Sequence, residues 1–251
     1  MNLILLEPDD VDASGQATLS GPRAAHLRQV LRVEPGRTVR VGLIDGPCGT
    51  ATVRAADQRA VTLSCVFETD TPARPSVDLL LALPRPKVMG RLWAQLAALG
   101  VGRIVLTNAA RVERHYFDTH VLAPDHYRPR LVEGLQQSRD TRLPHVSIHR
   151  QLKILIEDHL DRLCGVGARA LADPGASAPI RGPMPSGERL LLAIGPEGGW
   201  NEYERALLMA HGFEPVGMGR RTLRSDTACI ALLALAHHAV TTSPPTASEP
   251  S

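Results

Sequence analysis

The sequence predicts an α/β protein with a mostly parallel sheet, preceded by a smaller β-rich domain. From residue 77 onward, short apolar runs alternate with segments of helical periodicity, as they do in helix-covered parallel sheets. Between Thr38 and Phe67 apolar residues recur at every second position instead, which is typical of antiparallel strands. A polar, proline-bearing stretch at 69–75 separates the two patterns. We therefore expect domains at 1–73 and 74–241, and a disordered tail at 242–251.

The first domain begins with an extended segment and a short amphipathic helix at 23–32, which Pro35-Gly36 ends. Turn residues at Asp45-Gly46-Pro47 and Asp57-Gln58 divide the alternating region that follows into three antiparallel strands. A small β-barrel is the economical way to close them.

The second domain is predicted from its alternating elements. Strands are expected at 77–83, 103–107, 145–149, 168–172, 189–194 and 213–218. Helices are expected at 87–99, 125–138, 151–162, 201–211 and 226–240. Gly100 is a normal residue after a helix end, and Asn201 with Glu204 has the spacing of a capping box.

Composition excludes several classes of protein. The apolar run Ile230–Val240 contains two histidines and is shorter than the roughly 20 residues that cross a bilayer. The N-terminus lacks the basic start of a secretory signal, so we expect a cytoplasmic protein. The 4 cysteines form no CxxC pair and are predicted to be buried free thiols. His115, Asp118 and His120 match no metal-ligand spacing, and no metal site is expected.

Charge is distributed unevenly along the chain. Residues 1–73 carry 7 Arg against 9 acids, a net of −2, whereas residues 85–150 carry 11 Arg or Lys against 5 acids, a net of +6. The basic region is a candidate face for a polyanion such as RNA. A general preference for arginine, with 26 Arg and 2 Lys in the chain, is the alternative explanation.

Two C-terminal segments combine glycine and charge. Residues 195–199 (GPEGG) follow a fully apolar strand, where glycines let main chain approach a ligand, although a tight turn would need them too. Gly219 precedes a second segment with arginines at 220, 221 and 224, which suit phosphate or carboxylate recognition. Asp226 can simply cap the helix that follows. Neither segment is GxGxxG or a P-loop, which disfavours a nucleotide-dependent enzyme of those kinds.

Together, IGPEGG and MGRRTLRSDTA closely resemble the signature of the bacterial ribosomal small-subunit methyltransferase E family. The resemblance extends to HLRQVLRVEPGRTVRV, ALPRPK, LAALGVGRIVL and GLQQSRDTRLP, almost from end to end. It implies an N-terminal PUA-like RNA-binding barrel, followed along the chain by a SPOUT-class α/β domain with a deep trefoil knot. It also implies a homodimer that transfers the methyl group of S-adenosyl-L-methionine to N3 of a uridine in 16S ribosomal RNA of the small subunit.

The resemblance also implies site residues. The cofactor is expected against Leu171, Ala172, Gly195, Pro196, Glu197, Gly198, Gly199, Met218, Gly219, Leu223 and Arg224. RNA is expected to meet Arg23, Arg28, Arg32, Arg139 and Arg142. The chain departs from the family pattern at 136–140, where Gln-Gln-Ser-Arg-Asp replaces the more usual Glu-Gln-Ser/Cys-Gly-Arg, at Ala98, and at Asp226, where Glu is usual.

The reaction indicates catalytic candidates. Uracil N3 carries a proton near neutral pH, and Glu197 and Asp226 are the acids best placed to accept it. Arg139, Arg142 or Arg224 could stabilise the resulting anion. Both acids have a structural alternative, as a partner for loop amides and as a helix cap. Rival functions are a non-catalytic RNA-binding assembly factor and a SPOUT methyltransferase with a different RNA target.

Overall fold

A computed structural model of the chain describes residues 3–165, 167–180, 188–219, 221 and 223–241. These residues form two compact units: the first comprises Met1–Arg74 with Val132–Leu143, and the second comprises Pro75–Leu131 with Pro144–Ser251. The change of unit after Arg74 lies one residue from the expected domain boundary. The return of residues 132–143 to the first unit was not expected. The expected tail at 242–251 lies outside the described residues.

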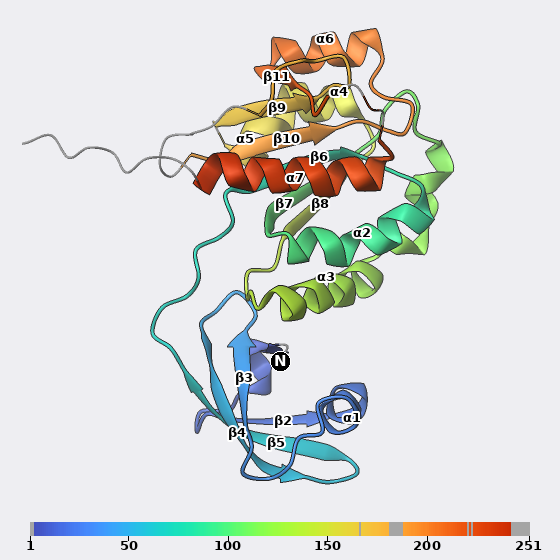
Figure 1. Ribbon diagram of the computed structural model, residues 1–251. Coiled ribbons are helices and arrows are strands. Elements are labelled where there is room, and N and C mark those ends of the chain that lie inside the picture. The colour runs from blue at the N-terminus through green and yellow to red at the C-terminus, as the bar shows by residue number, and fades with distance from the viewer. Residues whose placement is uncertain (1–2, 166, 181–187, 220, 222, 242–251) are drawn as a thin grey trace, which may run out of the picture. The chain divides into compact units, whose positions relative to one another are not determined.

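The first unit is built on a five-stranded sheet within the described residues (Figure 1). Its strands are β1 (Ile4–Leu6), β2 (Gln16–Ser20), β3 (Thr38–Leu43), β4 (Cys48–Ala56) and β5 (Ala60–Phe67), in the order β1-β3-β4-β5-β2. Only the β1–β3 pair is parallel. The three antiparallel strands expected after Thr38 are confirmed. No pairing of the edge strands β1 and β2 occurs in the described part, so the barrel remains a prediction.

Alternation explains the core of this unit. Along β2 the buried and exposed residues strictly alternate, and the buried ones join the apolar side chains of β3, β4 and β5 in one cluster. The α1 helix (Gly21–Gln29) adds Ala24 and Leu27 to that cluster. A 3₁₀ turn, η1 (Pro8–Asp10), lies between β1 and β2.

The second unit contains a six-stranded sheet, counted over the described residues, in which every pairing is parallel. The strands are β6 (Val77–Ala82), β7 (Val101–Thr107), β8 (His145–His149), β9 (Ala168–Ala172), β10 (Leu190–Ile194) and β11 (Phe213–Val216), in the order β11-β9-β10-β6-β7-β8. The α/β class and the parallel sheet are therefore confirmed. Both β6 and β10 are buried along their whole length, and apart from Asp78 in β6 their residues are apolar, as is typical of strands covered on both faces.

The helices lie close to the ranges predicted from the sequence, with one exception. They are α2 (Pro86–Ala98), α3 (Pro124–Ser138), α4 (Leu152–Ile154), α5 (Leu160–Cys164), α6 (Glu202–Ala210) and α7 (Ser225–Thr241), with 3₁₀ turns η2 (Arg114–Asp118) and η3 (His120–Leu122). The single helix expected at 151–162 is instead α4, a π-helical stretch η4 (Leu155–His159) and α5. Periodicity cannot reveal this change because one π turn leaves the apolar pattern helical. Figure 1 shows α7 lying across the sheet with α2 beside it.

Buried side chains complete the second unit. Trp93 is fully buried, and its Nε1 donates to the carbonyl of Val121 at 3.0 Å, which confirms it as a core residue. The 4 cysteines all lie in the described part, and each is a buried free thiol, as expected. Among the described residues, no helix combines the length and hydropathy that a membrane span needs.

Candidate functional site: two adjoining cavities

The strand order places three loops at one edge of the second unit's sheet. Since β9, β10 and β11 are parallel neighbours, the segments after their carboxyl ends lie together. These segments and α7 enclose a cavity of about 270 Å³, which we call the glycine-loop cavity. Its walls are residues 171–174, 194–200, 216–219, Arg205, Arg221, Leu223, Ser225, Ala228 and Leu232. Ten of the eleven residues expected to contact a cofactor line it; Arg224 is the exception.

Glycine conformation shapes this cavity. Gly199 has φ +74° and Gly219 has φ +99°, in the left-handed region that favours glycine, and a Cβ at either position would face open space. At Gly195 a Cβ would lie 3.0 Å from Nε1 of Trp200. The main chain therefore forms the cavity wall directly, without side chains that would fill it.

Residues 195–199, the glycine loop, are anchored through Glu204, a buried residue in the first turn of α6. Its carboxylate accepts the amide of Ala110 at 2.6 Å and that of Asn201 at 2.9 Å. The amide of Glu204 in turn donates to Oδ1 of Asn201 at 2.8 Å, so the expected capping box is confirmed. The guanidinium of Arg111 donates to the carbonyl of Gly198. Contacts from Glu204 and Arg111 thus hold the two ends of this loop region in place.

Two buried polar groups in the cavity wall, Nε1 of Trp200 and Oγ of Ser225, have no hydrogen-bond partner among the described residues. Buried polar groups are nearly always hydrogen-bonded, and an unpaired one costs about 1–3 kcal/mol. A ligand with polar atoms at these points would satisfy both groups.

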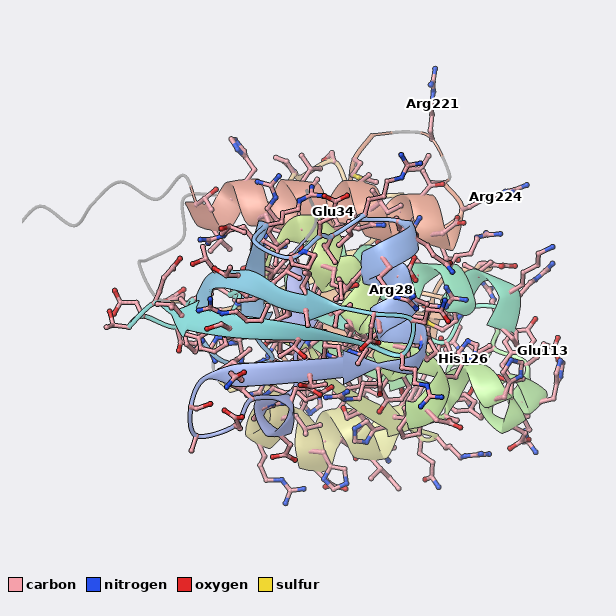
Figure 2. The ribbon with its side chains drawn as sticks, turned by 90° about the horizontal axis from the view of Figure 1, so that it is seen from below. Arg28, Glu34, Glu113, His126, Arg221 and Arg224 are labelled. Atoms are coloured by element: carbon pink, nitrogen blue, oxygen red, sulfur yellow. The ribbon has the colours of Figure 1, made fainter. Side chains whose placement is uncertain are left out.

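A second cavity, of about 470 Å³, adjoins the first and shares Glu197, Leu223 and Ser225 with it. We call it the basic cavity. Its other walls are Arg85, Lys87, Val88, Arg91, Arg224 and Asp226. Nε of Arg85 lies 2.9 Å from a carboxylate oxygen of Glu197, and Arg91 lies 3.1 Å from Asp226. Figure 2 shows Arg221 and Arg224 on the loop before α7, with the Arg221 side chain extending away from the ribbon.

The basic cavity thus brings together three of the five catalytic candidates: Glu197, Arg224 and Asp226. It also contains Arg85, Lys87 and Arg91, which the sequence analysis did not select. The sequence could have indicated them, because Arg85 and Lys87 lie within five residues of the end of a predominantly apolar strand, β6. Loops after the strands of a parallel sheet share one edge, so these residues belong near the glycine loop.

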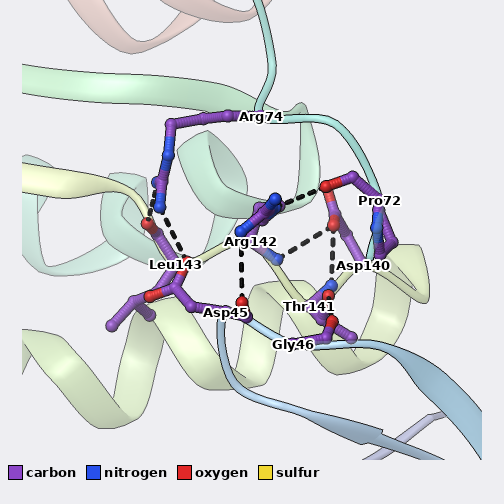
Figure 3. Close-up of polar contacts among 8 residues, drawn as sticks. All are labelled: Asp45, Gly46, Pro72, Arg74, Asp140, Thr141, Arg142 and Leu143. Atoms are coloured by element: carbon purple, nitrogen blue, oxygen red, sulfur yellow. Dashed lines mark hydrogen bonds and ion pairs between the residues drawn. The ribbon is translucent and has the colours of Figure 1, made fainter. Parts of the chain in front are cut away.

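Arg142 has structural partners in the first unit (Figure 3). Its guanidinium donates to the main-chain carbonyls of Pro72 and Asp45, and its amide donates to Asp140. Arg74 reaches the Asp45 carboxylate and the Leu143 carbonyl, both at 2.8 Å. These contacts fasten the end of residues 132–143 to two loops of the first unit. They give Arg142 a structural role that does not depend on contact with the uracil that reacts.

The other expected RNA-facing arginines also belong to the first unit, and they differ in exposure. Arg23 is tied to Asp10 at 2.8 Å and to the carbonyl of Leu5. Arg32 and Arg139 are exposed, with φ +49° and +62°. Arg28, labelled in Figure 2, lies on α1 and is half-buried. Arg32 and Arg139 are therefore the most available of the five for a polyanion.

The histidine-rich segment has protein partners. Asp118 pairs with Arg150 at 2.8 Å, and the rings of His120 and His126 pack with their centroids 4.9 Å apart. The described residues contain no cluster of three or more metal-ligating side chains.

Comparison with known proteins agrees with this arrangement. Residues 71–237 match the RNA methyltransferase domain family. The ribosomal RNA small subunit methyltransferase E of Treponema pallidum is 33% identical over 94% of this chain and 92% of its own length. Similar folds include the Neisseria gonorrhoeae methyltransferase E bound to S-adenosyl methionine (TM-score 0.75, 20% identity, covering 93% of this chain and 95% of that one). A Legionella pneumophila putative methyltransferase with bound cofactor is also similar (TM-score 0.75, 22% identity, 95% and 97%). The chain therefore belongs to the ribosomal RNA small subunit methyltransferase E family.

Proposed function

We propose that the chain transfers the methyl group of S-adenosyl-L-methionine to N3 of one uridine in 16S ribosomal RNA. Family membership supports the RNA of the small subunit as the substrate. The observation that carries the proposal is the glycine-loop cavity, in which main chain is exposed beside two unpaired polar groups. The intact cavity favours an enzyme over a non-catalytic assembly factor.

The residues of the cavity fit this cofactor. Leu171, Ile194 and Leu232 offer apolar contact to an adenine ring, and the exposed loop amides and carbonyls can form hydrogen bonds with the polar edge of that ring. Nε1 of Trp200 and Oγ of Ser225 offer further hydrogen bonds. The volume of about 270 Å³ is close to the lower limit of roughly 300 Å³ for small-molecule sites. When bound, the cofactor supplies an electrophilic methyl group.

Of the two acids, Glu197 is the better candidate to accept the N3 proton. It lines both cavities, and the protein contact of its carboxylate is the ion pair with the exposed Arg85. Asp226 instead accepts from Arg91 and from the amide of Thr227 in the first turn of α7, where it favours the helix. Arg224 lines the basic cavity and stays protonated, so it is available to an anionic group of the RNA.

Assembly and topology complete the proposal. Ile230 and Leu235 of α7 are 37% and 43% exposed, which suits contact with a second copy in a two-fold homodimer, whereas Leu233 is fully buried in the core. We also assign the family's trefoil knot to the loops around the glycine-loop cavity and a PUA-like role to the first unit. A ribosomal RNA substrate supports the expected cytoplasmic location.

The test is calorimetric titration of the purified protein with S-adenosyl-L-methionine. Micromolar binding by the wild type and loss of binding on filling the cavity would support the proposal. Absence of binding by the folded wild type would exclude a methyltransferase and leave the assembly factor as the function.

A further inference from the structure

We propose that the basic cavity holds the single RNA nucleotide that receives the methyl group, with Lys87 and Arg224 binding its phosphate. This inference rests on the proposed function and identifies where its substrate enters. The cavity, of about 470 Å³, is within the size range of pockets for small organic ligands. Because it shares Glu197, Leu223 and Ser225 with the glycine-loop cavity, a base placed in it lies next to the cofactor.

The charge of the basic cavity favours an anion. It contains four cationic side chains and two carboxylates, and the ion pairs Arg85–Glu197 and Arg91–Asp226 account for both carboxylates. Lys87 and Arg224 are exposed and have no ion pair or side-chain hydrogen bond to another described residue. The cavity therefore has two cations available to a phosphate.

The Arg85–Glu197 pair connects phosphate binding to the reacting base. Arg85 is exposed, so this pair is weak in water, and a phosphate bound at Lys87 competes for the same guanidinium. Transfer of Arg85 to the phosphate leaves the Glu197 carboxylate free to accept the proton of uracil N3. In this arrangement Arg85 is a positioning residue and Glu197 is the catalytic residue.

The chain offers a direct test because it contains only 2 lysines. Lys153 on α4 is the matched control, since it is exposed, lines neither described cavity and has one loose partner, Glu157 at 3.9 Å. Amine-reactive labelling read by mass spectrometry should show Lys87 protected at least fivefold by small ribosomal subunits, and Lys153 unprotected. Equal labelling of Lys87 with and without subunits would overturn the proposal.

Variants separate this proposal from the function itself. Lys87→Ala and Arg224→Gln should each raise the KM for small subunits about tenfold, the effect of one charge-assisted hydrogen bond. Each should also leave cofactor affinity by calorimetry within twofold, and Lys153→Ala should change neither quantity. If the wild type binds no cofactor, the proposed function fails, and the protection of Lys87 from labelling alone decides whether the cavity binds RNA. If the wild type methylates and both cavity variants keep the native KM, the cavity proposal fails while the function stands.

Discussion

Replacing Glu204 by alanine should loosen the glycine loop without touching a ligand. The substitution removes the acceptor of two amides, Ala110 at 2.6 Å and Asn201 at 2.9 Å. Hydrogen bonds to a charged group contribute about 1.5–3 kcal/mol each, so the lower limit for two is about 3 kcal/mol of unfolding free energy. For a protein of this size that corresponds to a melting temperature lower by roughly 6–12 °C. Cofactor affinity should fall as well, because the loop that forms the cavity loses its anchor.

Glu202→Ala is the control for this experiment. Glu202 lies in the same first helical turn but is exposed, so its loss should cost no more than about 0.3–1 kcal/mol through the helix dipole. Differential scanning calorimetry measures the stability of both variants, and titration with S-adenosyl-L-methionine measures binding. A drop of less than 2 °C for Glu204→Ala, or equal effects of the two substitutions, would show that the buried carboxylate does not hold the loop.

Other substitutions test the remaining assignments. Gly199→Val should lower cofactor affinity more than tenfold. Gly212 also has a positive φ, +82° against +74° at Gly199, but it lies outside both described cavities, so Gly212→Val should destabilise the protein and leave affinity intact in the same titration. Arg142→Leu should lower the unfolding free energy in urea by about 2 kcal/mol because it removes hydrogen bonds to two carbonyls, whereas Arg139→Gly relieves a positive φ and should be neutral or stabilising. If Arg139→Gly lowers methylation with stability intact, its side chain faces RNA; a native rate would remove it from the RNA surface. Burial lowers the pKa of His237 below its usual 6.5, so the unfolded state binds more protons than the folded state. The free energy of unfolding should therefore fall as the pH drops below about 6.5. His237→Gln should flatten the curve of melting temperature against pH. Burial raises the pKa of the Cys229 thiol to about 12, so its reaction with a thiol reagent should be negligible at pH 8 in the native protein, and rapid labelling there would contradict the packing of α7.

Local patterns account for most of the second unit. Six strands and nearly all helices were expected from local patterns such as the run 190–194, because a parallel strand buried on both faces is typically apolar throughout. The loops that line the glycine-loop cavity were selected through their glycines and the resemblance together. Long-range pairings could not be predicted in this way. The buried Asp78 in β6 pairs with Arg189, 111 positions away, and no local pattern links the two residues.

Long-range contacts also explain two placements that local patterns do not indicate. Residues 132–143 read as part of the second domain because their sequence continues a helix, yet Thr141 and Arg142 bond to Gly46 and Asp45 of the first unit. Lys87 was not selected because nothing in the local sequence distinguishes a single lysine near a helix start. The sheet brings it to the wall of the same cavity as Glu197.

The central claim is methylation of one uridine at N3, and direct mapping of the product tests it. The purified protein would be incubated with methyl-labelled S-adenosyl-L-methionine and small ribosomal subunits whose 16S RNA lacks uridine methylation at N3. The RNA would then be digested and analysed by mass spectrometry. We expect one labelled 3-methyluridine in one 16S fragment. Label on another base or another uridine atom, or no label from a protein that binds the cofactor, would contradict it.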